Sequence, residues 1–354
     1  MTESKRIDYL DMAKGIGILL VIIGHISYVS EPVRQYISSF HMPLFFVISG
    51  ILLCYKQEEN SSLREFAGRK FKGLMMPYYF FSLCVLLIES ARIIWKNANT
   101  WENVFRQAFQ SLCLQGVSVL WFLPALFMAE MVFLFLRKRF KPLGTVICLV
   151  VLCFVTYCGS LFVQECLGAS DNLSAELCYD VFSMIFRNLF CVSFVGMGYY
   201  FAFLWLDRKS SWRLELSLTI ILFVFTGTIA KLYGAVDLRG MNLGNLLWFV
   251  IGGCFGSVGV ILLCRLIAKV QIKFLQSFLI FLGCNSLLIM VTHLDFRVLY
   301  VSIRLAEGLR ENLLKSNALF CTSIVVFVIL IECVIIFFVN LFRKKLKCNG
   351  LKNS

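Results

Sequence analysis

The sequence predicts an all-α polytopic membrane protein, and its composition and its pattern of apolar segments both point to this class. Of its 354 residues, 59% are hydrophobic and only 16% are charged, whereas a soluble domain carries about 25% charged residues. The mean hydropathy is +0.81. Apolar stretches of roughly 17–25 residues, long enough to cross a bilayer as a helix, recur along the whole chain. Ten are expected, at residues 11–29, 38–55, 74–95, 117–136, 143–163, 184–206, 214–232, 243–264, 275–294 and 317–341.

The positive residues predict the orientation of these segments, because Lys and Arg are retained on the cytoplasmic side of a membrane. If the N-terminus lies inside, 22 of the 34 Lys and Arg residues fall on the inner side and nine fall in outer loops. The remaining three, Lys14, Arg187 and Lys231, lie within spans. An odd number of spans would place a strongly basic loop outside. We therefore expect about ten transmembrane helices with both termini in the cytoplasm.

The chain is expected to form one integral membrane domain over residues 1–345, followed by a short basic cytoplasmic tail over 346–354. The connections between spans are too short to fold independently. The first apolar run does not read as a cleavable signal peptide, because Asp8 and Asp11 precede it and no small-residue cleavage site follows. The net charge of +13 is explained by topology and by attraction to anionic lipids of the inner leaflet, so no nucleic-acid partner is expected.

The fifteen cysteines do not indicate a metal site. Most lie within the expected spans, where Cys behaves as a small hydrophobic residue. No CxxC pair or other metal-ligand spacing occurs, and no metal is predicted. Cys166 and Cys178 share one outer loop and would pair only if the outside is oxidising.

The chain has three histidines, His25, His41 and His293, and each lies in or beside an apolar segment. Histidine titrates near neutral pH, and an ionisable group at membrane depth indicates a functional site because its burial is costly. His25 lies fifteen residues into the first span, about 22 Å from its inner end. The second span descends from outside and the ninth rises toward it, so all three histidines are expected in the outer third of the bilayer. For His41 and His293, a hydrogen bond to a headgroup or to neighbouring backbone is an equally good explanation.

Lys14 and His25 are eleven residues apart, just over three helical turns, so they project from one face about 16 Å apart. Asp11 is close enough in sequence to pair with Lys14. Gly15 and Gly17 would let another helix or a ligand approach this stripe closely. Taken alone, Lys14 could also extend to the membrane interface without any further role.

Five further ionisable residues fall inside the expected spans. Glu89, Arg187 and Lys231 lie toward the outside, and Glu130 and Glu332 lie toward the cytoplasm. Structural pairing is the simplest explanation for any one of them, although intramembrane charges also line transport pathways.

Four sequence blocks and a late histidine carry a resemblance to a known family. They are Arg6–His25 (RIDYLDMAKGIGILLVIIGH), Phe40–Gly50 (FHMPLFFVISG), Arg69–Tyr78 (RKFKGLMMPY), Leu120–Leu126 (LWFLPAL) and His293. In this order they resemble the acyltransferase-3 family of bacterial integral membrane acyltransferases, particularly its fucose-4-O-acetylase-like branch. The blocks are spread over nearly the entire chain.

The resemblance implies a ten-helix enzyme of the bacterial cytoplasmic membrane. It would transfer an acyl group, usually acetyl, from cytoplasmic acyl-coenzyme A to a hydroxyl of a surface glycan or its lipid-linked precursor. The family's motif of an arginine, ten residues and a histidine maps onto Lys14 and His25. The lysine departs from that motif, because an ammonium group cannot form a bidentate fork.

The chemistry implied by the resemblance gives roles to particular residues. A sugar hydroxyl that attacks a thioester needs a base, which contributes about 10²–10⁴-fold, and His25 is the expected base. His41 or His293, either directly or through Asp295, would orient it or donate to the developing oxyanion. The phosphates of coenzyme A need a cationic cradle, for which the sequence offers Lys14, Arg69, Lys70 and Lys72.

Trp121 and Phe122, at the outer start of the fourth span, could stack on a sugar ring or could simply anchor the helix in the aromatic belt. Two other functions remain open from the sequence. A transporter or glycan exporter would depend on ion gradients and ignore acetyl-coenzyme A. A non-catalytic membrane module would tolerate the loss of His25. Whether transfer is direct or passes through an acyl-histidine also stays open.

Overall fold

A computed structural model describes residues 7–96, 100–168, 173–206, 210–270, 272–310 and 316–350. Over these ranges the chain is almost entirely helical, with an isolated backbone bridge between Asp237 and Asn242 in place of any strand. The all-α prediction is confirmed. The expected tail at 346–354 falls partly outside these ranges: a helix runs on to Gly350, and residues 351–354 are not among those described.

Fifteen α-helices make up the described chain. They are α1 (Asp8–His25), α2 (Glu31–Ser38), α3 (His41–Tyr55), α4 (Leu63–Lys70), α5 (Met76–Lys96), α6 (Trp101–Leu112), α7 (Phe122–Arg139), α8 (Pro142–Leu167), α9 (Leu173–Phe201), α10 (Trp212–Tyr233), α11 (Leu246–Val270), α12 (Lys273–Cys284), α13 (Ser286–Asp295), α14 (Val298–Arg310) and α15 (Asn317–Gly350). A short 3₁₀ turn, η3 (Ser118–Trp121), leads directly into α7.

Most of the expected spans are long apolar helices. Eight segments of the described chain have the length and composition to cross a membrane, and α12 with α13, bent by 68°, makes a ninth. The eight are Glu31–Tyr55, Leu63–Trp95, Ser118–Arg139, Pro142–Leu167, Ser174–Trp205, Trp212–Tyr233, Leu246–Val270 and Asn317–Lys345. The remaining expected span, at residues 11–29, corresponds to α1. This helix is more charged than the others because its 18 residues include Asp8, Asp11 and Lys14.

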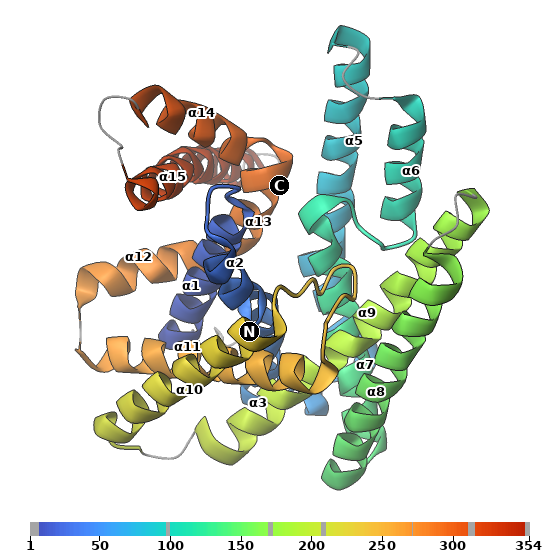
Figure 1. Ribbon diagram of the computed structural model, residues 1–354, viewed down its shortest axis with the longest axis vertical. Helices are drawn as coiled ribbons and strands as arrows, with labels where there is room; N and C mark the ends of the chain where they lie inside the picture. The colour runs from blue at the N-terminus through green and yellow to red at the C-terminus, as the bar shows by residue number, and fades with distance from the viewer. Residues whose placement is uncertain are drawn as a thin grey trace.

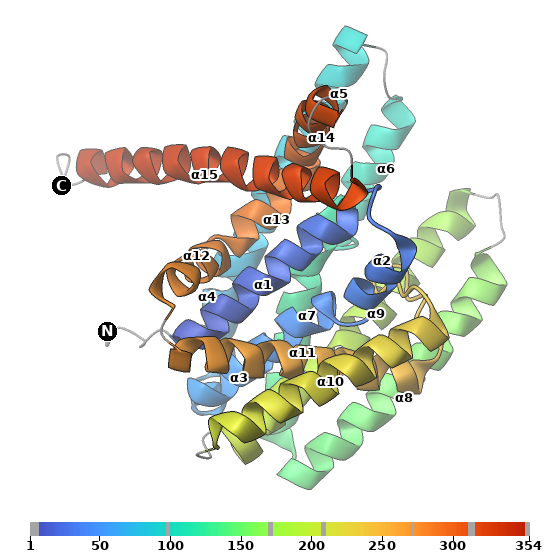
Figure 2. The same cartoon turned by 60° about the vertical axis from the view of Figure 1, so that its left-hand side comes forward.

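Two of the longer connections between the expected spans, at about 96–116 and 295–316, contain the further helices α6 and α14. Each is short and amphipathic rather than apolar throughout, so neither has the composition of a span. Figure 1 shows α6 alongside α5, and α14 near the start of α15. In Figure 2 the start of α1 and the end of α15 lie on the same side of the bundle.

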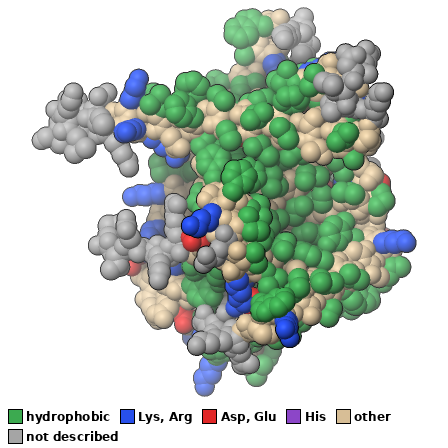
Figure 3. Space-filling model, turned by 90° about the vertical axis from the view of Figure 1, so that its left-hand side faces the viewer, with side chains coloured by type: hydrophobic (Ala, Val, Ile, Leu, Met, Phe, Trp, Pro, Cys, Tyr) green, Lys and Arg blue, Asp and Glu red, His purple; other side chains and the backbone are tan. Residues whose placement is uncertain are grey.

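The spans form an inner and an outer group. In the spans that contain α3, α7, α9 and α11, 56–67% of the apolar window is buried inside the protein, whereas the value is 22% for those that contain α5, α8, α10 and α15. Hydrophobic side chains accordingly cover most of the molecular face in Figure 3. A surface of this kind is stable only in lipid, so the chain is a multi-pass membrane protein.

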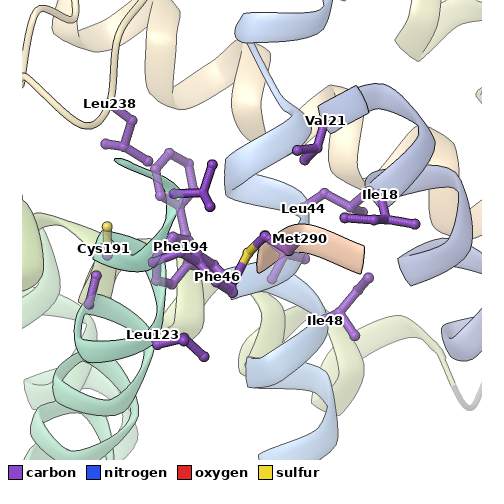
Figure 4. Packing of buried hydrophobic residues seen from close by; sticks show 14 of the residues in the cluster. Ile18, Val21, Leu44, Phe46, Ile48, Leu123, Cys191, Phe194, Leu238 and Met290 are labelled. Carbon is purple, nitrogen blue, oxygen red and sulfur yellow. The ribbon is translucent and has the colours of Figure 1, made fainter. Parts of the chain in front are cut away.

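Glycines bring the inner helices into backbone contact. A Cβ at Gly15 of α1 would lie 2.1 Å from the Leu279 carbonyl oxygen of α12, and one at Gly283 would lie 1.8 Å from the Asp11 carbonyl oxygen. Gly50 of α3 meets α9 in the same way. The close approach expected at Gly15 is therefore confirmed, and it fixes α1 against α12 and α13. Figure 4 shows the core beside this contact, where Ile18, Val21, Leu44, Phe46, Ile48, Leu123, Cys191, Phe194, Leu238 and Met290 pack together.

Candidate active site

A cavity of about 1200 Å³ lies between α1, α3, α7, α12 and α13. Its wall is apolar over most of its length, and its polar groups come from several helices. These are Asp11, Lys14, Ser49, Tyr55, Lys56, Lys70, Glu130, Cys284 and Ser286. Two of the four residues expected to bind phosphate, Lys14 and Lys70, thus face one cavity, together with Lys56.

Ion pairs hold two of these lysines. The Lys14 ammonium donates to Asp11 Oδ1 at 2.9 Å, as the i, i+3 spacing predicts. The Lys70 ammonium donates to Glu130 Oε1 at 2.6 Å, and the Ser49 hydroxyl donates to the same oxygen. Glu130 is 1% exposed, and its Oε2 has no hydrogen-bond partner among the described residues. The lysines are therefore held in position by carboxylates that a phosphate could replace as partners.

The other two residues expected in the cradle lie elsewhere. Arg69 pairs with Glu58 and stacks over Phe66, and it does not line the cavity. Lys72 is exposed, also away from the cavity wall. Lys70 ends α4, and Lys72 lies two positions further on. Residues two positions apart on a helix point in different directions, so only one of the two faces the cavity.

The three histidines come together from three helices. The rings of His25 and His293 meet edge to face with centroids 5.2 Å apart, and His41 interacts electrostatically with His25. His293 is fully buried, His41 is half-buried, and His25 is exposed at the end of α1. The juxtaposition expected from span directions and depths is present.

Each histidine makes the same backbone hydrogen bond. Nδ1 lies 2.8 Å from the Val21 oxygen in His25, 2.8 Å from the Ile37 oxygen in His41, and 3.0 Å from the Ile289 oxygen in His293. A carbonyl oxygen only accepts, so a neutral ring must carry its proton on Nδ1. Each Nε2 then presents a lone pair, and that of His293 is buried with no partner among the described residues. All three neutral imidazoles are therefore set up as proton acceptors.

The cavity reaches close to this cluster. Phe45 and Met290 line it, and they lie one helical turn from His41 on α3 and from His293 on α13. Lys14 and His25 stand at the two ends of the α1 stripe. The three histidines are not among the residues that line the cavity, whose wall ends about one helical turn from His41 and His293.

Asp295 follows His293 on α13 and lies against the η3 turn. The Ser118 side chain hydrogen-bonds to it, whereas its Oδ2 is buried without a partner in the described chain. Arg239, exposed on the loop between α10 and α11, is near enough to Asp295 and His25 for its charge to act on both, although it forms no ion pair with Asp295 in the described chain. Sequence reasoning missed Arg239, because nothing in an outer loop marks one arginine as facing a site.

The two aromatic residues at the start of α7 differ in their surroundings. Phe122 lines the cavity and packs edge to face with Phe45 and Phe46. Trp121 is 6% exposed, and the Arg187 guanidinium lies over its ring at 4.9 Å from the centroid. Phe122 therefore lies beside Phe45 in the cavity wall, whereas the Arg187 guanidinium covers one face of Trp121.

Other residues considered from the sequence have local partners. Glu89 pairs with Arg92, and both carboxylate oxygens of Glu332 lie 2.7 Å from the Thr292 hydroxyl. Cys166 and Cys178 are both free. The sequence did not predict that Ser49, Lys56 and Glu130 line this cavity. Glu130 gave the only sequence signal, as a charge buried in a span.

A comparison with protein families decides the class of this protein. The model of the acyltransferase domain family, acyltransferase-3, matches residues 7–337, nearly the whole chain. The chain belongs to the acyltransferase-3 family. It is therefore a membrane acyltransferase, and the cavity with its histidine cluster is the candidate site of transfer. No curated protein matches this acyltransferase.

Proposed function

We propose that this acyltransferase moves an acetyl or similar short acyl group from cytoplasmic acyl-coenzyme A to a hydroxyl of a cell-surface glycan or its lipid-linked precursor. One observation carries the proposal. A single cavity has Lys14, Lys56 and Lys70 in its wall and approaches within one helical turn of His41 and His293. A polyanionic donor with a long, thin acyl-bearing arm matches this arrangement of charges and apolar wall.

The donor end binds the phosphates of acyl-coenzyme A. Lys14 and Lys70 exchange Asp11 and Glu130 for phosphate oxygens, and Lys56 adds a third positive charge at the cavity wall. Charge-assisted hydrogen bonds to phosphate are among the stronger contacts a protein makes. The apolar wall formed by Leu74, Leu126 and Leu287 then accommodates the pantetheine arm, so the thioester is directed toward the histidines.

The outer end carries out the transfer. His25 Nε2 takes the proton of the acceptor hydroxyl while that oxygen attacks the thioester carbon. A carbon–oxygen bond forms, the carbon–sulfur bond breaks, and the imidazolium returns its proton to the leaving thiolate. Neutral His41 and His293 present lone pairs in the same way, so they donate to an oxyanion only when protonated.

The acceptor approaches from the outer face, because His25 is the exposed member of the cluster. Phe122 borders the meeting point of the two substrates. The excess of basic residues on the inner side of the chain agrees with the bacterial cytoplasmic membrane as the location of the enzyme.

The test is label transfer in membranes that contain the protein. Acetyl-labelled coenzyme A is supplied, and label is followed into the lipid-linked and polymeric glycan fractions. Wild-type membranes should transfer label, His25→Ala membranes should not, and Lys70→Met should require more donor. Lys72→Met is the matched control, because Lys72 lies two residues away but outside the cavity.

Transfer that survives His25→Ala would retain the enzyme and reject His25 as the base. Absence of transfer with any acyl-coenzyme A, in membranes that hold the cell's own glycan, would reject the proposed donor and acceptor.

A further inference from the structure

Arg187 is a buried cation that the transfer mechanism does not use. It lies on α9 and is completely buried. Its Nη2 donates to the Gln115 carbonyl oxygen at 3.1 Å, its Nε donates to Asn188 Oδ1 at 3.3 Å, and Trp121 covers one face. No carboxylate forms an ion pair with it in the described chain, and Nη1 is buried without a hydrogen-bond partner.

An uncompensated arginine inside a membrane protein is costly. Backbone and amide oxygens satisfy part of the guanidinium but leave its charge unneutralised. The guanidinium is planar, and its fork of donors matches an oxyanion. A group with this geometry, one free donor and no ion-pair partner among the described residues has the properties of an anion site, although the charge of Asp237 acts on it from a distance.

Arg187 lies close to the reaction centre through one short segment. Gln115, which it contacts, and Ser118, which contacts Asp295, belong to the same turn before α7. Leu114, Gly116 and Ser118 all have positive φ angles, of 62°, 77° and 51°. Strained backbone of this kind persists only where its surroundings enforce it, and it clusters at functional sites.

A second cation faces the same region from the loop between α10 and α11. Arg239 is near enough to His25, Asp295 and Arg187 for its charge to act on all three. Two carboxylates lie in the same region. One is Asp295 on α13, and the other is the exposed Asp237, which accepts a hydrogen bond from the Arg239 backbone N–H at 2.9 Å.

Leu238, next to Arg239 on this loop, belongs to the same buried core cluster as Cys191, which lies one turn from Arg187 on α9 (Figure 4). Gly234 and Gly244, both with left-handed backbone, stand at the two ends of the loop. Because Arg187 is fully covered, an anion reaches it only when its cover moves, and glycines permit such a change.

We propose that Arg187 and Arg239 bind a carboxylate or phosphate of the acceptor, so that the enzyme is specific for an acidic glycan or a phosphate-linked one. This rests on the proposed function for the identity of the acceptor, but the anion site itself does not. The oxyanion holds the sugar beside His25, and Asp295 accepts hydrogen bonds from its hydroxyls.

The test is direct binding to purified protein in a non-ionic detergent, read as the shift in Tm. The probes are methyl β-glucuronide, inorganic phosphate and the neutral methyl β-glucoside. One or both anions should raise the Tm of the wild type, and the neutral glycoside should not. Phosphate can also bind the lysines of the donor cavity, so the recognised group is identified by the anion whose shift is lost or reduced in the Arg187 and Arg239 variants.

Two variants and one control locate the binding. Arg187→Met should abolish the shift, and Arg239→Gln should reduce it. Lys72→Met should preserve it, because Lys72 is exposed and lies outside the donor cavity. If Arg187→Met does not fold, the exposed Arg239 still provides the test. An unchanged shift in Arg239→Gln, an equal shift with methyl β-glucoside, or no shift with either anion would overturn the proposal.

A kinetic measurement adds specificity. With acetyl-coenzyme A as donor, Arg239→Gln should raise the KM for the acidic acceptor about tenfold, as loss of one charge-assisted contact implies. The KM for acetyl-coenzyme A should not change. Because the binding assay needs no turnover, a failure of the proposed acyl transfer leaves the anion site separately measurable.

Discussion

The two ends of the site differ in how their polar groups are paired. At the donor end, Lys14 is paired with Asp11 and Lys70 with Glu130. At the acceptor end, His293 Nε2 and Asp295 Oδ2 are buried without partners in the described chain. Buried polar atoms are nearly always hydrogen-bonded, so exceptions need an explanation. Under the proposed function, exchangeable ion pairs hold the cations at the donor end, while unpartnered atoms at the acceptor end are available to substrate. Glu130 Oε2, buried without a partner in the described chain, is the exception at the donor end.

Helix α1 joins these two ends, and breaking its contact with α12 should have the largest effect. Gly283→Val should prevent correct assembly, because even its Cβ would overlap the Asp11 carbonyl oxygen. The yield of monodisperse protein in detergent measures this. Gly308→Val is the control, because no atom lies within 4 Å of a Cβ at that position. Normal assembly of Gly283→Val would contradict the proposed contact.

Next, the acceptor end should control the rate rather than the binding of donor. His25→Ala should lower kcat by about 10²–10⁴-fold, the contribution expected of a general base. The KM for acetyl-coenzyme A should change little. Steady-state kinetics with purified enzyme measure both constants. A rise in donor KM with normal kcat would mean that His25 binds substrate instead.

The donor end should show the opposite pattern with a smaller effect. Lys70→Met should raise the KM for acetyl-coenzyme A roughly tenfold, the value of one charge-assisted hydrogen bond, and leave kcat nearly unchanged. Lys72→Met, whose side chain lies outside the cavity, should behave as wild type. Equal effects of the two substitutions would show that only general positive charge matters.

The smallest effect should come from salt. Lys14 and Lys70 are partly exposed, with 26% and 31% of their side-chain surfaces accessible. Screening should therefore raise the donor KM roughly twofold between low and physiological ionic strength. The kcat set by the histidines should be insensitive to salt. A salt-dependent kcat would remove the distinction between the two ends.

The helical membrane class and most spans could be predicted from sequence, because hydrocarbon requires long apolar helices whatever their packing. The sequence also identified the histidines, since a titratable group in an apolar run stands out before any fold is known. It could not separate Lys70 from Lys72, because the rotation of the helix against its neighbours decides which of them faces the cavity. The same limit applies to α12 and α13, where one apolar run is bent by 68°.

The sequence by itself thus determined the medium in which this protein folds, its helices, its family resemblance and the residues able to exchange protons. Only the tertiary structure decided which charges meet. It paired Lys70 with Glu130, sixty residues apart, and left Arg187 without a counter-ion among the described residues. The reason is physical: span composition reflects the lipid that surrounds each helix, whereas ion pairing depends on helix rotation and contact across the bundle, which composition does not encode.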